Sequence, residues 1–173
     1  MNRYFSVWMM TLLIASNVKA NETKYFIAAV EAEGEGELAL KAAELDKMVC
    51  LAGAEVAKKK KENVLCAHEV KAMMQHFAMT QNLGIDTART VQGPEYYFQN
   101  AKVIFRSFVD NVTTKNGTLV PTLRIQYLTG GNPPVLIKET RIAISKLPKD
   151  HELVFIEDIM LSLLQARLKS PKR

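Results

Sequence analysis

The chain has 173 residues, and its 23 basic and 18 acidic residues give a formal net charge of +5. Hydrophobic residues make up 48% of it, which is enough for one compact domain with a single core. A charge this small gives no reason to expect nucleic acid as a partner, and export would argue against it further.

The first twenty residues have the pattern of a secretory signal peptide. Arg3 precedes an uncharged apolar run from Tyr4 to Ser16, and Val18-Lys19-Ala20 offers small or medium side chains to signal peptidase. The run is shorter than the roughly 20 residues of a membrane-spanning helix. We therefore expect residues 1–20 to be removed, leaving a periplasmic or secreted chain without a transmembrane segment. Loss of Arg3 and Lys19 leaves 21 basic against 18 acidic residues, a formal charge of +3.

Residues 24–32 predict a strand, and a long helix is predicted from about Glu37. Apolar residues occupy both parities of the strand, so both of its faces are expected to be largely buried. The helix carries an apolar stripe at spacings of three and four residues, which indicates a core-facing side. The stripe consists of Leu38, Ala42, Leu45, Val49, Ala52 and Val56.

Cys50 and Cys66 are the two cysteines of the chain, and an oxidising compartment favours their pairing. A helix unbroken to Lys61 would place Cys50 about 16 Å along the axis from the turn. Bonded cysteines need Cα atoms within about 7 Å. The chain must therefore reverse near Lys58, or the helix must unwind near Gly53. We predict a helical hairpin with its tip at residues 58–63, joined by a Cys50–Cys66 disulfide.

A second helix is predicted from Ala67 to about Leu83, with Gly84 as its C-terminal stop. One of its faces is apolar and is expected to point inward, and residues 84–98 are expected to form a connecting loop. The inward residues are Val70, Met73, Phe77 and Met74.

Three runs between residues 100 and 146 alternate apolar and polar side chains, which predicts strands with one wet face. In the second run, for example, Leu123, Ile125 and Tyr127 alternate with polar residues. The alternation is poorer at residues 135–137. Asn116-Gly117 and the glycine- and proline-rich residues 130–134 supply turns, so the runs predict an antiparallel meander.

A last helix is expected after Pro148, with Asp150 as its N-cap, although residues 153–156 also fit a short strand. Its apolar stripe is Leu153, Ile156, Met160, Leu163 and Leu164. The expected fold is α+β, with a meander of three to four strands packed by the helical hairpin and the C-terminal helix. One domain would span residues 21–169, followed by a basic tail at residues 170–173.

The segment from Ala28 to Val56 carries a family resemblance. A strand ends in Ala32-Glu33-Gly34-Glu35-Gly36, and an alanine-rich helix then runs through Leu51-Ala52-Gly53-Ala54-Glu55-Val56. This arrangement resembles the opening module of flagellar assembly protein T and of similar small bacterial envelope modules. The chain departs from the module by inserting a lysine loop and a second helix before the strands. The resemblance implies a non-enzymatic, exported accessory protein that helps to assemble or steady an envelope structure.

Two groups of residues carry candidate chemistry. Cys66-Ala67-His68 could activate a thiol, but a structural disulfide is the favoured reading because Cys50 is available. Met73, His76 and Met79 offer thioether and imidazole donors of the kind that copper(I) accepts, although methionines also fill irregular cores. No catalytic residue and no cofactor are predicted.

The lysine segment, residues 58–61, is the strongest cluster of like charge in the chain. A solvated loop is the ordinary reading of such a run. Its functional reading is contact with an acidic or phosphate-rich surface, because each cation near an anionic membrane contributes about 1 kcal/mol.

Three hypotheses follow. The first is an exported accessory, assembly or adaptor protein of the bacterial envelope that meets a partner protein through its sheet edge or the lysine segment. The second is a small periplasmic copper-binding protein. The third is a hydrolytic enzyme, which would require His68, His76 or His151 to meet a carboxylate in a pocket.

Overall fold

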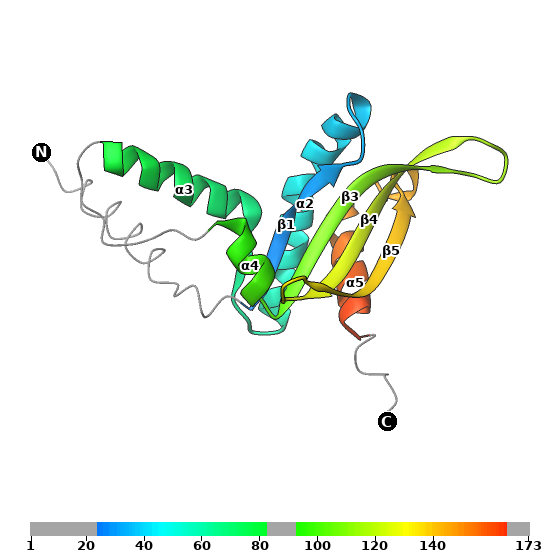
Figure 1. The fold of residues 1–173 in the computed structure, drawn as a ribbon. Helices are drawn as coiled ribbons and strands as arrows, with labels where there is room; N and C mark the ends of the chain where they lie inside the picture. The colour runs from blue at the N-terminus through cyan, green and yellow to red at the C-terminus, as the bar shows by residue number, and fades with distance from the viewer. Residues whose placement is uncertain (1–23, 83–92, 166–173) are drawn as a thin grey trace, which may run out of the picture.

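The computed structural model describes residues 24–82 and 93–165, which form an α+β fold around a mixed five-stranded sheet in the order β2-β1-β3-β4-β5 (Figure 1). Helices α2 and α5 pack on one face of this sheet, and α4 with the first turn of α3 packs on the other. The elements are β1 (Tyr25–Ala32), α2 (Glu37–Lys59), β2 (Val64–Cys66), α3 (Ala67–Asn82), α4 (Pro94–Asn100), β3 (Val103–Thr113), β4 (Leu119–Thr129), β5 (Val135–Ala143), η2 (Ile144–Lys146) and α5 (Glu152–Gln165).

The antiparallel meander predicted for residues 100–146 is confirmed as β3-β4-β5. The first strand does not extend that meander, because β1 lies between β2 and β3 and is parallel to both. Its apolar residues on both parities suit this interior position, since Phe26 is buried on one face of the sheet and Ile27 on the other.

The predicted stripe of α2 is confirmed, since all six of its residues are buried. The predicted helical hairpin is wrong, because a strand and not a helix follows the turn. Helix α2 continues to Lys59, the chain reverses at residues 60–63, and it returns as the extended strand β2. From Cys50 the helix rises about 14 Å to its end, and extended residues recover that distance in about four steps of roughly 3.3 Å. The disulfide therefore forms without unwinding the helix at Gly53.

Helix α3 forms as predicted, but it projects away from the sheet (Figure 1). Val70 in its first turn is buried, whereas Met73 and Met74 are exposed, so the prediction that they face inward is wrong. The side chain of Phe77 and the stop at Gly84 lie outside the described structure.

The expected loop at residues 84–98 contains a helix that the sequence prediction missed. Gly93 precedes α4 and Pro94 occupies its first turn, where the missing proline N–H costs nothing. Tyr97 of α4 stacks on Phe26 of β1 with ring centroids 5.3 Å apart. This contact seals the second, smaller core of the protein.

The C-terminal segment is helical from Glu152, so the short strand considered for residues 153–156 is wrong. Ile156, Met160 and Leu163 of its predicted stripe are buried against α2 and the sheet. In the described ranges, no helix is both long and apolar enough to cross a membrane. The expected signal peptide and basic tail lie outside the described residues.

Candidate functional site

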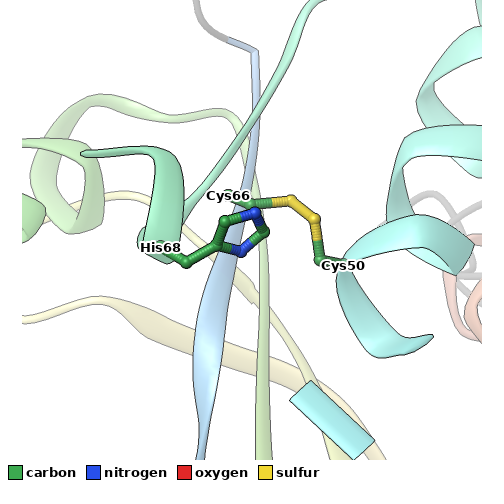
Figure 2. Close-up of side chains that lie close together, drawn as sticks. All are labelled: Cys50, Cys66 and His68. Carbon is green, nitrogen blue, oxygen red and sulfur yellow. A yellow bond between two sulfur atoms is a disulfide. The ribbon is translucent and has the colours of Figure 1, made fainter. Parts of the chain in front are cut away.

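Cys50, Cys66 and His68 form a sulfur–imidazole cluster where α2, β2 and α3 meet (Figure 2). The cysteines are joined by the predicted disulfide, with Cα atoms 5.9 Å apart. One ligand atom from each of the three residues lies within 4.8 Å of the others, and His68 is exposed while Cys66 is 2% exposed. The paired sulfurs leave no free thiol at Cys66 for His68 to activate in this state.

Local sequence features position this cluster. Cys66 ends β2, whose register with β1 pairs it with Ile27. Its backbone N–H donates to Oε2 of Glu69 at 2.8 Å, and burial of Val70 anchors the turn that carries His68. The cluster is thus held by strand pairing, a hydrogen bond and a buried side chain as well as by the disulfide.

The β5 edge, the outer edge of strand β5, has no described strand paired with it. At its beginning, Val135, Leu136 and Ile137 have 56%, 50% and 40% of their surface exposed. Tyr127 pairs with Lys138 and Leu128 with Leu136, so Ile137 is an extra residue in a β-bulge. The bulge explains the poor alternation of residues 135–137 in the sequence.

A cluster of charges lies on the sheet face that carries α4. The guanidinium carbons of Arg106 and Arg124 each lie 4.5 Å from the centre of the Phe108 ring. Arg124 forms ion pairs with Glu33 and Asp110, and its Nε lies 3.3 Å from Oδ2 of Asp110. These contacts leave Phe108 only 7% exposed, so part of the strand face that was predicted to be solvent-exposed is buried.

Sequence reasoning missed this charge cluster. Alternation along a strand places Arg106 and Arg124 on the polar side of their own strands, but pairs such as Arg124 with Glu33 are 91 residues apart in the chain. Only the strand order brings these side chains together.

The lysine segment is partly neutralised. Lys58 pairs with Glu55, and Lys59 at the end of α2 pairs with Glu157, which is buried in α5. The hydrogen bond from Lys59 to Glu157 raises the pKa of Lys59. Lys60 and Lys61 form the turn itself, with Lys61 in a left-handed conformation at φ 56°. The segment therefore presents less positive charge than four consecutive lysines suggest.

The candidate copper ligands are exposed on the projecting helix. Met73 is 37% and Met79 67% exposed, and His76 is also exposed. Among the described residues, Cys50, Cys66 and His68 are the one group of three His, Cys, Asp or Glu residues spaced to hold a metal ion.

An open groove of about 400 Å³ lies between β1 and α2. Alanines line most of it, and Asp46 accepts a hydrogen bond from the backbone N–H of Val30 at 2.8 Å. The register of β1 on β3 shifts between Ile27 and Val30, so Asp46 satisfies a backbone donor at this irregularity in the strand. The sequence offered no signal for this role, because Asp46 sits among other charged residues of an amphipathic helix.

Burial also raises the pKa values of two tyrosines. The pKa of Tyr25 is raised first by burial and then by the nearby carboxylate of Glu62. Burial is likewise the main cause of the raised pKa of Tyr97. Both residues support the cores and neither belongs to the sulfur–imidazole cluster.

Comparison with known proteins shows similarity of backbone path. No protein-family model and no curated protein matches the chain. A dodecameric PelC variant from Paraburkholderia phytofirmans is 12% identical, with a TM-score of 0.41 over 83% of this chain and 87% of that chain. The hypothetical protein CT253 from Chlamydia trachomatis is 15% identical, with a TM-score of 0.34 over 75% of this chain and 78% of that chain.

Proposed function

We propose that this chain is an exported, non-enzymatic accessory or adaptor protein of the bacterial cell envelope. In this proposal it binds an extended segment of a partner protein along the β5 edge. The supporting observation is that an unpaired strand edge coincides there with exposed Val135, Leu136 and Ile137. The backbone groups of an edge strand can hydrogen-bond to an added strand, and the neighbouring apolar side chains select its sequence.

The charges along β5 indicate what kind of segment fits. Glu139 accepts a hydrogen bond from Gln126 and pairs with Arg141, so its charge is already engaged. Lys138 is exposed and has no ion pair with another residue of the described structure. An edge lysine opposes indiscriminate pairing with apolar strands. The partner segment is therefore apolar with an acidic residue that meets Lys138.

Two further features support an envelope setting for this proposal. Disulfides such as Cys50–Cys66 persist in oxidising compartments, including the bacterial periplasm. The expected signal peptide would deliver the chain there, and the resemblance of residues 28–56 to the flagellar assembly module implies an assembly role.

The experiment places a photo-crosslinking amino acid at position 137 of the mature chain in envelopes of the native host. Position 40 carries the same group as a control, because Leu40 is 68% exposed on α2, away from β5. We expect one partner protein to crosslink at position 137 and none at position 40. Equal crosslinking at the two positions would contradict the proposal.

A second variant tests whether the captured protein pairs with the strand edge. Leu136→Lys combined with Ile137→Lys should abolish capture, whereas Leu40→Lys should leave it unchanged. With the purified partner, amide hydrogen exchange should slow along β5. A partner that still binds the double variant with full affinity argues for a different surface.

A further inference from the structure

The sulfur–imidazole cluster contains residues of the kinds that bind metal ions, but its two cysteines are oxidised to a disulfide. Its three ligand atoms come from α2, β2 and α3 and lie within 4.8 Å of one another. Thiolates and imidazole together select thiophilic cations with filled d shells, Cu⁺ and Zn²⁺ in particular. In the disulfide state the two sulfurs are bonded to each other and cannot act as thiolate ligands.

We propose that Cys50, Cys66 and His68 form a redox-gated binding site for such a cation, open only when the disulfide is reduced. A dithiol supplies two electrons and two protons, the S–S bond breaks to two thiols, and the dithiol itself becomes a disulfide. Metal binding then releases the two thiol protons, and His68 enters as neutral imidazole through a ring nitrogen.

The spacing of the cluster fits this coordination. Ligand atoms at about 2.0–2.3 Å from one metal ion in tetrahedral geometry lie roughly 3.3–3.8 Å from each other. A ring nitrogen of His68 already lies within 4.8 Å of both sulfurs, and breaking the S–S bond lets the two sulfurs separate to that spacing. His68 is exposed, so a fourth position on the solvent side is open to water for Zn²⁺, and Cu⁺ needs only the three protein ligands.

The elements that carry the ligands do not depend on the disulfide alone. Helix α2 packs on the sheet through fully buried Val49, Ala52 and Val56. Strand β2 stays paired with β1, and the bond from Cys66 N–H to Glu69 joins it to the first turn of α3. Reduction therefore leaves the ligands close together, and the site is preorganised.

This site is distinct from the Met73, His76 and Met79 set. Those residues lie farther along α3, where the helix projects from the body of the protein (Figure 1). His76 therefore provides a matched control for His68, since both histidines are exposed on the same helix.

The test reduces the purified chain with a phosphine, removes the phosphine without oxygen, and confirms the fold by circular dichroism. Titration with Co²⁺, a spectroscopic substitute for Zn²⁺, should give a thiolate charge-transfer band at one equivalent. Competition against a Cu⁺ chelator measures the affinity for Cu⁺. The cation that binds with the higher affinity is the preferred metal. The oxidised chain should bind neither ion.

Variants decide which residues are ligands. In the Co²⁺ titration, His68→Asn should weaken binding by about tenfold or more, Cys50→Ser should weaken the charge-transfer band, and His76→Asn should change neither. The proposal is overturned if the reduced chain binds neither cation, if it unfolds on reduction even with metal present, or if His68→Asn binds as tightly as the original chain.

Discussion

At the scale of single residues, Gly53 shows how closely α2 approaches the sheet. A Cβ atom at this position would lie 2.4 Å from Cδ1 and 2.7 Å from Cγ1 of Ile27, whose side chain is 1% exposed. Glycine is therefore required here by space, even though it is a poor helix former.

Gly53→Ala should destabilise the protein by about 1–3 kcal/mol through overpacking, in spite of the roughly 1 kcal/mol that alanine adds to helix propensity. Urea denaturation measures the change, and Glu44→Ala on the exposed side of α2 is the control. Adding Ile27→Val should recover part of the loss caused by Gly53→Ala, because the two side chains compete for one space. A stabilised single variant would show that α2 lies farther from β1 than described.

Arg124 and Arg141 face each other across β4 and β5 but differ in burial. The side chain of Arg124 is 14% exposed and pairs with Asp110, whereas that of Arg141 is 46% exposed and pairs with Glu139. Arg124→Met should cost about 3 kcal/mol, because it removes the cation that pairs with the buried Asp110 carboxylate. Arg141→Met should change the free energy of unfolding by less than about 0.5 kcal/mol. Equal effects would mean that the Phe108 cluster adds nothing to stability.

Among the elements, helix α3 shows that an apolar helix face can be buried at one end and exposed to solvent along the rest. Val70 is 0% exposed and ties the first turn of the helix to the second core. The methionines beyond it meet solvent because no described element lies over that part of the helix (Figure 1).

Met73→Gln and Met74→Gln should each change the free energy of unfolding by less than about 0.5 kcal/mol, as is usual for exposed positions. Val70→Ala should cost about 1–3 kcal/mol, because it removes two fully buried carbon atoms. Chemical denaturation of the three variants measures both effects. A large loss at Met73 or Met74 would mean that the methionine face is covered in the monomer in solution.

For the molecule as a whole, the raised pKa values of three groups predict that the free energy of unfolding decreases at alkaline pH. The folded state raises the pKa values of Tyr25, Tyr97 and Lys59, by burial for the tyrosines and by the hydrogen bond to Glu157 for the lysine. Each group thus holds its proton more tightly in the folded than in the unfolded chain. The resulting stability is fully present below the ordinary pKa values of 10.0 and 10.5 and is lost as the pH rises through the folded values.

Urea denaturation at pH values from about 8 to 11.5 should therefore show a free energy of unfolding that is level at first and then falls above about pH 10. Tyr25→Phe should make the fall shallower, because it removes one of the three groups. The exposed Lys60→Met variant is the control and should reproduce the original profile. A profile for Tyr25→Phe that is as steep as the original would assign the alkaline transition to other groups.

Most of the helices and strands and one covalent bond could be predicted from the amino-acid sequence. Helix α2, the meander and α5 follow from periodicities of two or of three to four residues, which depend only on neighbours along the chain. The disulfide followed from the oxidising compartment that the sequence predicts, and the limited reach of such a bond required the chain to reverse near Lys58 or the helix to unwind near Gly53.

The way in which these elements are assembled could not be predicted from the sequence. The position of β1 between two parallel neighbours, the extended return through β2 and the cluster around Phe108 depend on contacts between distant segments. An apolar stripe shows that a helix face is apolar, but it does not show which element covers that face. The prediction that Met73 and Met74 point inward is wrong for this reason. Local periodicity reports the conformation of a segment, whereas strand order and burial are set by the free energy of the whole chain.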